Sequence, residues 1–100
     1  MHISISGQHL ELSTALREHV MNKLHRISHH FEQVTNRHVV LHVDKNRYRV
    51  EATILARGTQ LHATAEAMDM YAAIDHAANK LHRQAIKHKE KSVITTRVKP

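Results

Sequence analysis

The sequence predicts a single α+β domain, a two-layer sandwich in which two helices cover one face of a four-stranded sheet. Four short segments alternate apolar and polar residues, and two longer segments repeat apolar residues three or four positions apart. Their order along the chain is β-α-β-β-β-α, which is typical of two layers. Because every strand alternates, we expect one face of the sheet to be buried and the other hydrated. No repeat, linker or second domain is visible.

The first expected strand is the segment HISIS, where Ile3 and Ile5 share one face and Gly7 follows. Ser13 or Thr14 can cap the first helix. The apolar stripe of this helix recurs at spacings of four, four, three and four residues, and it consists of Leu16, Val20, Leu24, Ile27 and Phe31. We therefore expect the helix to end near the last of these residues.

Three further strands are expected at residues 38–43, 49–56 and 61–66. The segment DKNRY between the first two of them predicts a loop, and Gly58 predicts a turn between the last two. The residues expected to face the core are Val39, Leu41, Val43, Val50, Ala52, Ile54, Ala56, Leu61, Ala63 and Ala65.

Asp69 is the expected N-cap of the second helix, and on a helical wheel at about 100° per residue this helix carries two stripes. The apolar stripe, expected to pack on the sheet, consists of Met70, Ile74, Ala77, Ala78, Leu81 and Ala85. The positive stripe, on the far side, consists of His76, Lys80, Arg83, Lys87 and Lys91. Residues 92–100 show no clear helical or strand period, and we expect them to form a basic, flexible tail after a domain that covers residues 1–91.

The charge is distributed unevenly, because residues 80–100 contain seven Lys and Arg against the single acid Glu90 and so account for the whole net charge of +6. Such asymmetry predicts an anionic partner, nucleic acid or an acidic membrane surface, the alternative being a solvated basic tail. The first helix also has a basic row, made of His19, Lys23, Arg26 and His30. Two basic rows on rigid helices suit the regularly spaced charges of a phosphate backbone, and they can face a common groove.

Several functional classes are excluded or disfavoured by composition. The chain has no cysteine, hence no disulfide and no thiol catalysis, and its two glycines form no phosphate-cradling loop. It has no secretory signal pattern and no apolar stretch of bilayer length, so we expect a cytoplasmic protein that does not bind membranes. No motif groups acids and serines into a catalytic set, so we expect no catalytic residues, no cofactor and no small-molecule substrate.

The twelve histidines raise the alternative of a small metal-dependent enzyme. His25 and His29 lie one helical turn apart, and His38 and His42 share a strand face. There is no His-Glu-x-x-His helix, and a tight site would need further ligands, so we expect no metal site. Histidines on or near the basic rows are candidates for pH-dependent phosphate contacts: His19, His30, His76, His82 and His88.

Two long segments carry a family resemblance: ATAEAMDMYAAIDHAANKLHRQAIKHKEK at residues 63–91 and ISGQHLELSTALREHVMNKL at residues 5–24. In these segments the chain resembles the ribosome hibernation promoting factors of bacteria, specifically the short form, within the ribosome-associated inhibitor and sigma-54 modulation protein family. The resemblance covers nearly all of residues 1–91. It implies a fold similar to that of double-stranded-RNA-binding domains. The basic tail after Lys91 departs from the short form.

The resemblance also implies a function. Members of the family bind the small ribosomal subunit and whole ribosomes in the channel for messenger RNA and the A- and P-site transfer RNAs, contacting 16S rRNA. They block translation in stationary phase, and the short form acts with a ribosome modulation factor to stabilise inactive ribosome dimers. At the matching positions for rRNA contact stand Arg17, Lys23, Arg26, Lys80, Arg83, Lys87, Lys89 and Lys91.

Two alternatives stay open beside this hypothesis. One is a generic module that binds double-stranded RNA by its A-form shape, without preference for the ribosome. The other is an inhibitor that acts on single ribosomes without promoting dimers.

Overall fold

A computed structural model describes residues 2–8, 10–28, 34–56 and 59–98, with side chains in the last helix described as far as Lys87. The predicted order of elements is confirmed. The elements are β1 (His2–Gln8), α1 (Thr14–Ser28), β2 (Val34–Asp44), β3 (Arg47–Ala56), β4 (Thr59–Ala67) and α2 (Met70–Val98).

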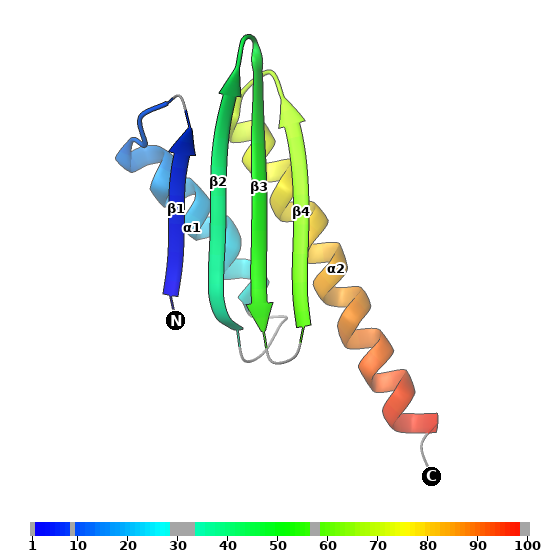
Figure 1. Cartoon of the computed structure of the whole chain (residues 1–100). Helices are drawn as coiled ribbons and strands as arrows, with labels where there is room; N and C mark the ends of the chain where they lie inside the picture. The colour runs from blue at the N-terminus through cyan, green and yellow to red at the C-terminus, as the bar shows by residue number, and fades with distance from the viewer. Residues whose placement is uncertain (1, 9, 29–33, 57–58, 99–100) are drawn as a thin grey trace.

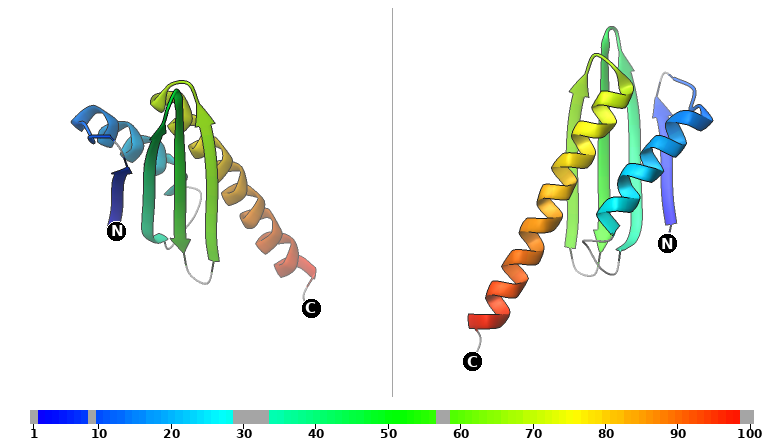
Figure 2. Two further views of the ribbon diagram at one scale, coloured as in Figure 1. Left: turned by 45° about the horizontal axis from the view of Figure 1, so that its top comes forward. Right: turned by 180° about the vertical axis from the view of Figure 1, so that it is seen from behind.

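The four strands form one sheet in the order β1-β2-β3-β4, with β1 parallel to β2 and the other neighbours antiparallel (Figure 1). The parallel pair follows from the connection, because α1 carries the chain back from the end of β1 to the start of β2. Both helices lie on the same face of the sheet, where they run side by side (Figure 2). The expected two-layer sandwich is therefore confirmed.

The core lies between the helices and the sheet, and it is built from the predicted apolar stripes. On the helices, the buried residues are Val20, Leu24, Ile27, Met70, Ala73, Ile74, Ala77, Ala78, Leu81 and Ala85. On the strands, they are Val39, Leu41, Val50, Ala52, Ile54, Leu61, Ala63 and Ala65. The alanines of α2 let the helix backbone approach the sheet closely, which accounts for the small residues on its buried face.

Both helices begin at the predicted caps. The Ser13 Oγ accepts a hydrogen bond from the Leu16 backbone N–H at 3.1 Å. The Asp69 Oδ2 accepts one from the Ala72 backbone N–H at 3.1 Å. Each cap satisfies a backbone donor that has no partner within the first helical turn, and so fixes the residue at which the helix starts.

The structure corrects the expected loop between β2 and β3. The predicted loop covered residues 44–48, but the strands continue to Asp44 and resume at Arg47. Lys45 turns the chain with a φ of 56°, in the left-handed region. Backbone pairing between Asp44 and Arg47 therefore extends the hairpin into polar residues that alternation alone did not assign.

The second helix is longer than its side-chain pattern indicates. The backbone of α2 stays helical to Val98, through residues where the sequence shows no helical period. Adding a residue to an existing helix needs one further hydrogen bond and no apolar partner, so periodicity does not mark its end. The division of the chain at residue 91 and the flexibility of the tail stay predictions. Phe31 and Gly58 lie outside the described residues.

Candidate nucleic-acid interface

The basic stripe of α2 lies on the flank of the helix that borders β4. The Lys80 Nζ donates a hydrogen bond to the Thr64 carbonyl oxygen at 2.7 Å, which fixes this flank over the strand. A hollow of about 230 Å³ lies here, lined by Ala65, Glu66, His76, Asn79, Lys80 and Arg83. The structure thus brings three of the predicted site residues, His76, Lys80 and Arg83, together around one depression. Lys87 follows them, exposed, on the same stripe.

The sequence predicts this stripe on the far side of the helix from the sheet, whereas the structure puts Lys80 on the flank beside β4, and the buried face of the helix fixes this position. Ala77, Leu81 and Ala85 are buried against the sheet, with exposed fractions of 1%, 0% and 0%. Because the basic residues are offset from these positions around the helix, packing of the alanine-rich face holds the basic flank in the solvent beside β4. Between Asp75 and Lys87 the helix contains no acid, so the positive field of this flank is opposed within the hollow only by Glu66.

A second cluster lies where α1 meets α2. The Asp75 Oδ1 is 2.7 Å from the His19 Nε2 and 3.5 Å from the Lys23 Nζ. The His19 ring meets the Tyr71 ring edge-on, with the centroids 5.0 Å apart and the planes at 78°. We call these four residues, His19, Lys23, Tyr71 and Asp75, the helix seam. Tyr71 is 39% exposed and contacts α1 at the surface of the helical layer.

The two basic rows do not face a common groove, which corrects the expectation from the sequence. His19 and Lys23 of the α1 row point toward Asp75, whereas Lys80 of the α2 row bonds to β4. Asp75 and Lys80 are separated by about 140° around α2, at about 100° per residue. The flank of α2 that meets α1 is therefore not the flank that carries Lys80.

The other predicted contact residues of the helical layer are distributed around these two places. Arg26 is exposed and continues the row of Lys23 on α1. Arg17 is exposed but lies about 120° from Lys23 around the helix, and so belongs to neither place. His82 is half-buried, on the same flank of α2 as Asp75 and Tyr71.

Some of the predicted residues cannot be placed by their side chains. His30 lies outside the described residues. His88, Lys89 and Lys91 belong to the helical backbone of α2, beyond the last described side chain. Their part in RNA binding stays a prediction.

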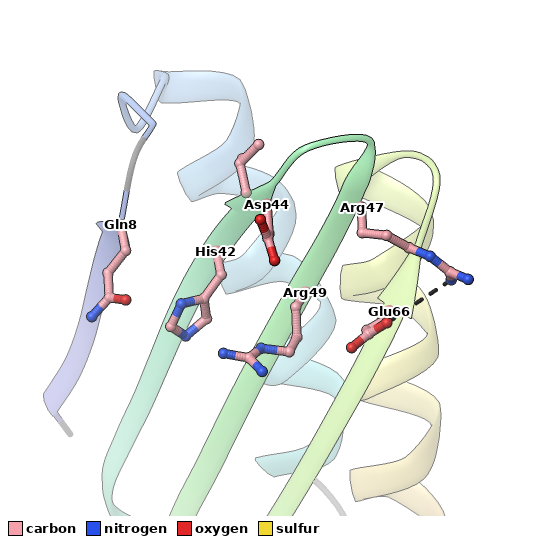
Figure 3. A pocket seen from close by; sticks show the side chains of 7 residues that line it. Gln8, His42, Asp44, Arg47, Arg49 and Glu66 are labelled. Carbon is pink, nitrogen blue, oxygen red and sulfur yellow. Dashed lines mark ion pairs between the residues drawn. The ribbon is translucent and has the colours of Figure 1, made fainter.

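The hydrated face of the sheet differs in charge from the helical layer. A shallow depression of about 320 Å³ there is lined by Gln8, His42, Val43, Asp44, Arg47, Arg49 and Glu66 (Figure 3). Acids lie among the bases of this face: Arg47 Nη1 lies 3.9 Å from Glu66 Oε2 on the neighbouring strand, and His42 Nε2 lies 3.1 Å from Glu51 Oε2. A face with interleaved acids attracts a polyanion less than the basic flank of α2 does.

Arg37 is a charged residue that the sequence patterns did not single out. It lies on β2, in register with Ile3 of β1 and Ile54 of β3, and is 9% exposed. Burial lowers the pKa of the Arg37 guanidinium from its usual value, because desolvation disfavours the charged form.

Within the described part of the chain, no three His, Asp or Glu side chains converge as metal ligands. In the same part, none of the helices has the length and apolar content that a membrane crossing requires. His25 and His38 are both exposed, and the latter lies on the sheet face opposite the helices.

Sequence reasoning missed the residues that tie the basic stripes to their neighbours. The sequence patterns assign no role to Asp75, yet its carboxylate contacts both His19 and Lys23. Thr64 acts through its backbone carbonyl, which no side-chain pattern can reveal. Asp75 follows Tyr71 by one helical turn on the same flank, and this spacing was the available signal.

A small basic α+β domain that presents cations on its helical layer, and balanced charges on its sheet, is typical of domains that bind a polyanion through their helices. The chain belongs to the family described as sigma 54 modulation protein / S30EA ribosomal protein, whose sequence model matches residues 3–93. This family comprises ribosome-associated hibernation factors and not enzymes.

Individual relatives agree with this assignment. The chain is 50% identical over 91 residues to a ribosome hibernation promoting factor of Pseudomonas putida, covering 91% of this chain and 89% of the relative. It is 42% identical over 91 residues to that of Escherichia coli strain K12, covering 91% and 96%. These relatives consist of little more than this domain, so the resemblance to the short form is confirmed.

Solved structures confirm the fold. A ribosomal subunit interface protein from Coxiella burnetii is similar with a TM-score of 0.81 and 35% identity, over 90% of this chain and 99% of that one. The N-terminal domain of Thermus thermophilus Protein Y is similar with a TM-score of 0.82 and 30% identity, over 88% and 99%.

Proposed function

We propose that this protein is a ribosome hibernation factor of the cytoplasm, which binds the small ribosomal subunit through its helical layer. It occupies the channel for messenger RNA and the A- and P-site transfer RNAs, contacts 16S rRNA and blocks translation in stationary phase. Together with a ribosome modulation factor it promotes inactive ribosome dimers. The names of its relatives support a role in ribosome hibernation, since they are ribosome hibernation promoting factors.

The observation that carries the proposal is the hollow beside β4, where His76, Lys80 and Arg83 converge. Rigid helical residues hold cations at fixed spacing, and such an array matches successive phosphates of a folded RNA. On the hydrated sheet face, acids lie next to the bases. We therefore expect this face to point away from the RNA in the complex.

The test is sedimentation of ribosomes on a sucrose gradient with and without the protein. We expect the protein to co-sediment with small subunits and whole ribosomes, and to shift whole ribosomes toward dimers when the modulation factor is present. Absence of co-sedimentation at moderate salt would refute the proposal. Co-sedimentation without dimers would replace the last step by inhibition of single ribosomes.

Competition separates this function from generic RNA binding. Excess RNA duplex is expected to leave the protein on the ribosome, because the proposed contacts depend on a folded surface and not on A-form shape alone. A generic module would be removed from the ribosome by the same competitor.

A further inference from the structure

The carboxylate of Asp75 sits where two donors of α1 converge. One oxygen, Oδ1, lies 2.7 Å from the His19 Nε2 and 3.5 Å from the Lys23 Nζ. A phosphate oxygen bound between these two side chains would need this same place, since it too is an anionic acceptor that prefers charge-assisted hydrogen bonds. The helix seam therefore already contains an anion supplied by the protein itself.

Stability alone does not account for this arrangement. The side chains of His19, Lys23 and Asp75 are 26%, 31% and 41% exposed, and ion pairs of such exposure contribute little to folding. The packing of the two helices is already fixed by their buried apolar faces. The main consequence of Asp75 is electrostatic, because it opposes the charge of Lys23, whereas Arg26 on the same row stands exposed.

We propose that Asp75 is a specificity-determining residue, whose carboxylate occupies the anion site of the helix seam and withholds Lys23 from indiscriminate binding of RNA. This inference rests on the proposed function, because it concerns how the helical layer selects among RNAs. Any RNA that approaches Lys23 meets repulsion from Asp75. An RNA surface that also reaches the α2 flank overcomes this repulsion with further contacts, whereas a generic duplex does not.

Such a residue raises selectivity by weakening the wrong complex. Specificity is a difference between two affinities, and an unfavourable charge that acts mainly on the competitor increases this difference. Neutralising Asp75 should therefore raise affinity for generic RNA more than affinity for the ribosome.

The test compares Asp75→Asn with the unchanged protein, using an RNA duplex of about 16 base pairs as the generic probe. At about pH 8, where imidazoles are mostly neutral, the affinity for the duplex is expected to rise about two- to five-fold. The salt dependence should also steepen by roughly 0.7–0.9 in log–log slope, because Lys23 becomes available for one more phosphate. Asparagine keeps a side-chain oxygen toward His19, and circular dichroism verifies the fold.

Two controls separate release of Lys23 from a simple change of net charge. Glu18→Gln removes one negative charge from an exposed position on α1 and should raise duplex affinity less than Asp75→Asn. In a Lys23→Gln background, Asp75→Asn should raise it no more than Glu18→Gln does, as a double-mutant cycle requires of coupled residues. Equal effects of Glu18→Gln and Asp75→Asn, or additivity in the cycle, would overturn the inference.

A measurement on the native Asp75 background keeps the inference testable if Asp75→Asn does not fold. Lys23→Gln is expected to weaken duplex binding less than Arg26→Gln, since Lys23 is opposed by Asp75 and Arg26 is exposed on the same row. An equal or larger loss for Lys23→Gln would contradict the inference. Ribosome co-sedimentation of the unchanged protein is measured separately. Absence of co-sedimentation would refute the proposed function, whereas the duplex affinities test only the role of Asp75.

Discussion

The side-chain amide of Gln84 on α2 bonds to both backbone groups of His62 on β4. Its Oε1 accepts from the His62 N–H at 3.3 Å, and its Nε2 donates to the His62 carbonyl oxygen at 2.8 Å. β4 is an edge strand, and Lys80 occupies the Thr64 carbonyl oxygen a little further along it. The helix that carries the basic stripe therefore also occupies backbone groups of β4 that would otherwise be free to pair with another chain.

Gln84→Ala removes both hydrogen bonds to His62, and we expect it to lower the free energy of unfolding by about 1–2 kcal/mol. It should also increase self-association, because it uncovers the edge of β4. Chemical denaturation and sedimentation velocity measure the two effects. Gln60→Ala, at an exposed position of the same strand, is the control and should change neither quantity appreciably. A Gln84→Ala protein as stable as the control would show that water replaces the two hydrogen bonds to His62.

The basic rows are tested by two double variants. Lys80→Ala with Arg83→Ala, and Lys23→Ala with Arg26→Ala, should each weaken ribosome binding and flatten its salt dependence. We expect the first double variant to lose more affinity, because Lys23 is opposed by Asp75.

The same substitutions should have small effects on folding. Replacing Arg83, Lys23 or Arg26 by alanine should change the free energy of unfolding by about 0.5 kcal/mol or less. Loss of the Lys80 bond to Thr64 should cost about 1 kcal/mol. Unchanged co-sedimentation of the Lys80/Arg83 variant at moderate salt would remove the hollow from the binding surface.

The alanine face of α2 should not tolerate larger side chains. Ala77 is 1% exposed, so Ala77→Leu is expected to destabilise the fold by about 1–3 kcal/mol through overpacking against the sheet. Ala72 is half-buried on the same helix, and Ala72→Leu should cost less. Thermal unfolding compares the two. A melting temperature of Ala77→Leu at or above that of the unchanged protein would contradict the packing described above.

Ribosome affinity is expected to increase as pH falls from about 7.5 to 6, since imidazoles gain positive charge over this range. Phosphate favours the protonated form, so binding takes up protons and tightens at lower pH. His76 lines the hollow with Lys80 and Arg83, whereas His82 lies on the other flank of α2. Affinity measured at fixed ionic strength should therefore lose part of its pH slope in His76→Gln, and less in His82→Gln. A slope that neither substitution changes would leave these histidines without this role.

The sequence by itself determined the elements, their order and their buried faces. Side-chain periodicity is a local property, so Leu24 on a helix and Leu41 on a strand could be assigned to the core from their neighbours in the chain. Ser13 and Asp69 could be assigned as caps because their partners lie three residues away. The family resemblance was available for the same reason, since its motifs are contiguous.

Only the tertiary structure decided which neighbour each flank of a helix meets. A helical wheel gives the angle between Asp75 and Lys80, but it does not say that one faces α1 and the other β4. That choice depends on contacts between residues far apart in sequence, such as His19 with Asp75 and His62 with Gln84. Such contacts arise when two apolar faces pack on one sheet, and the polar flanks then bond to whatever lies beside them.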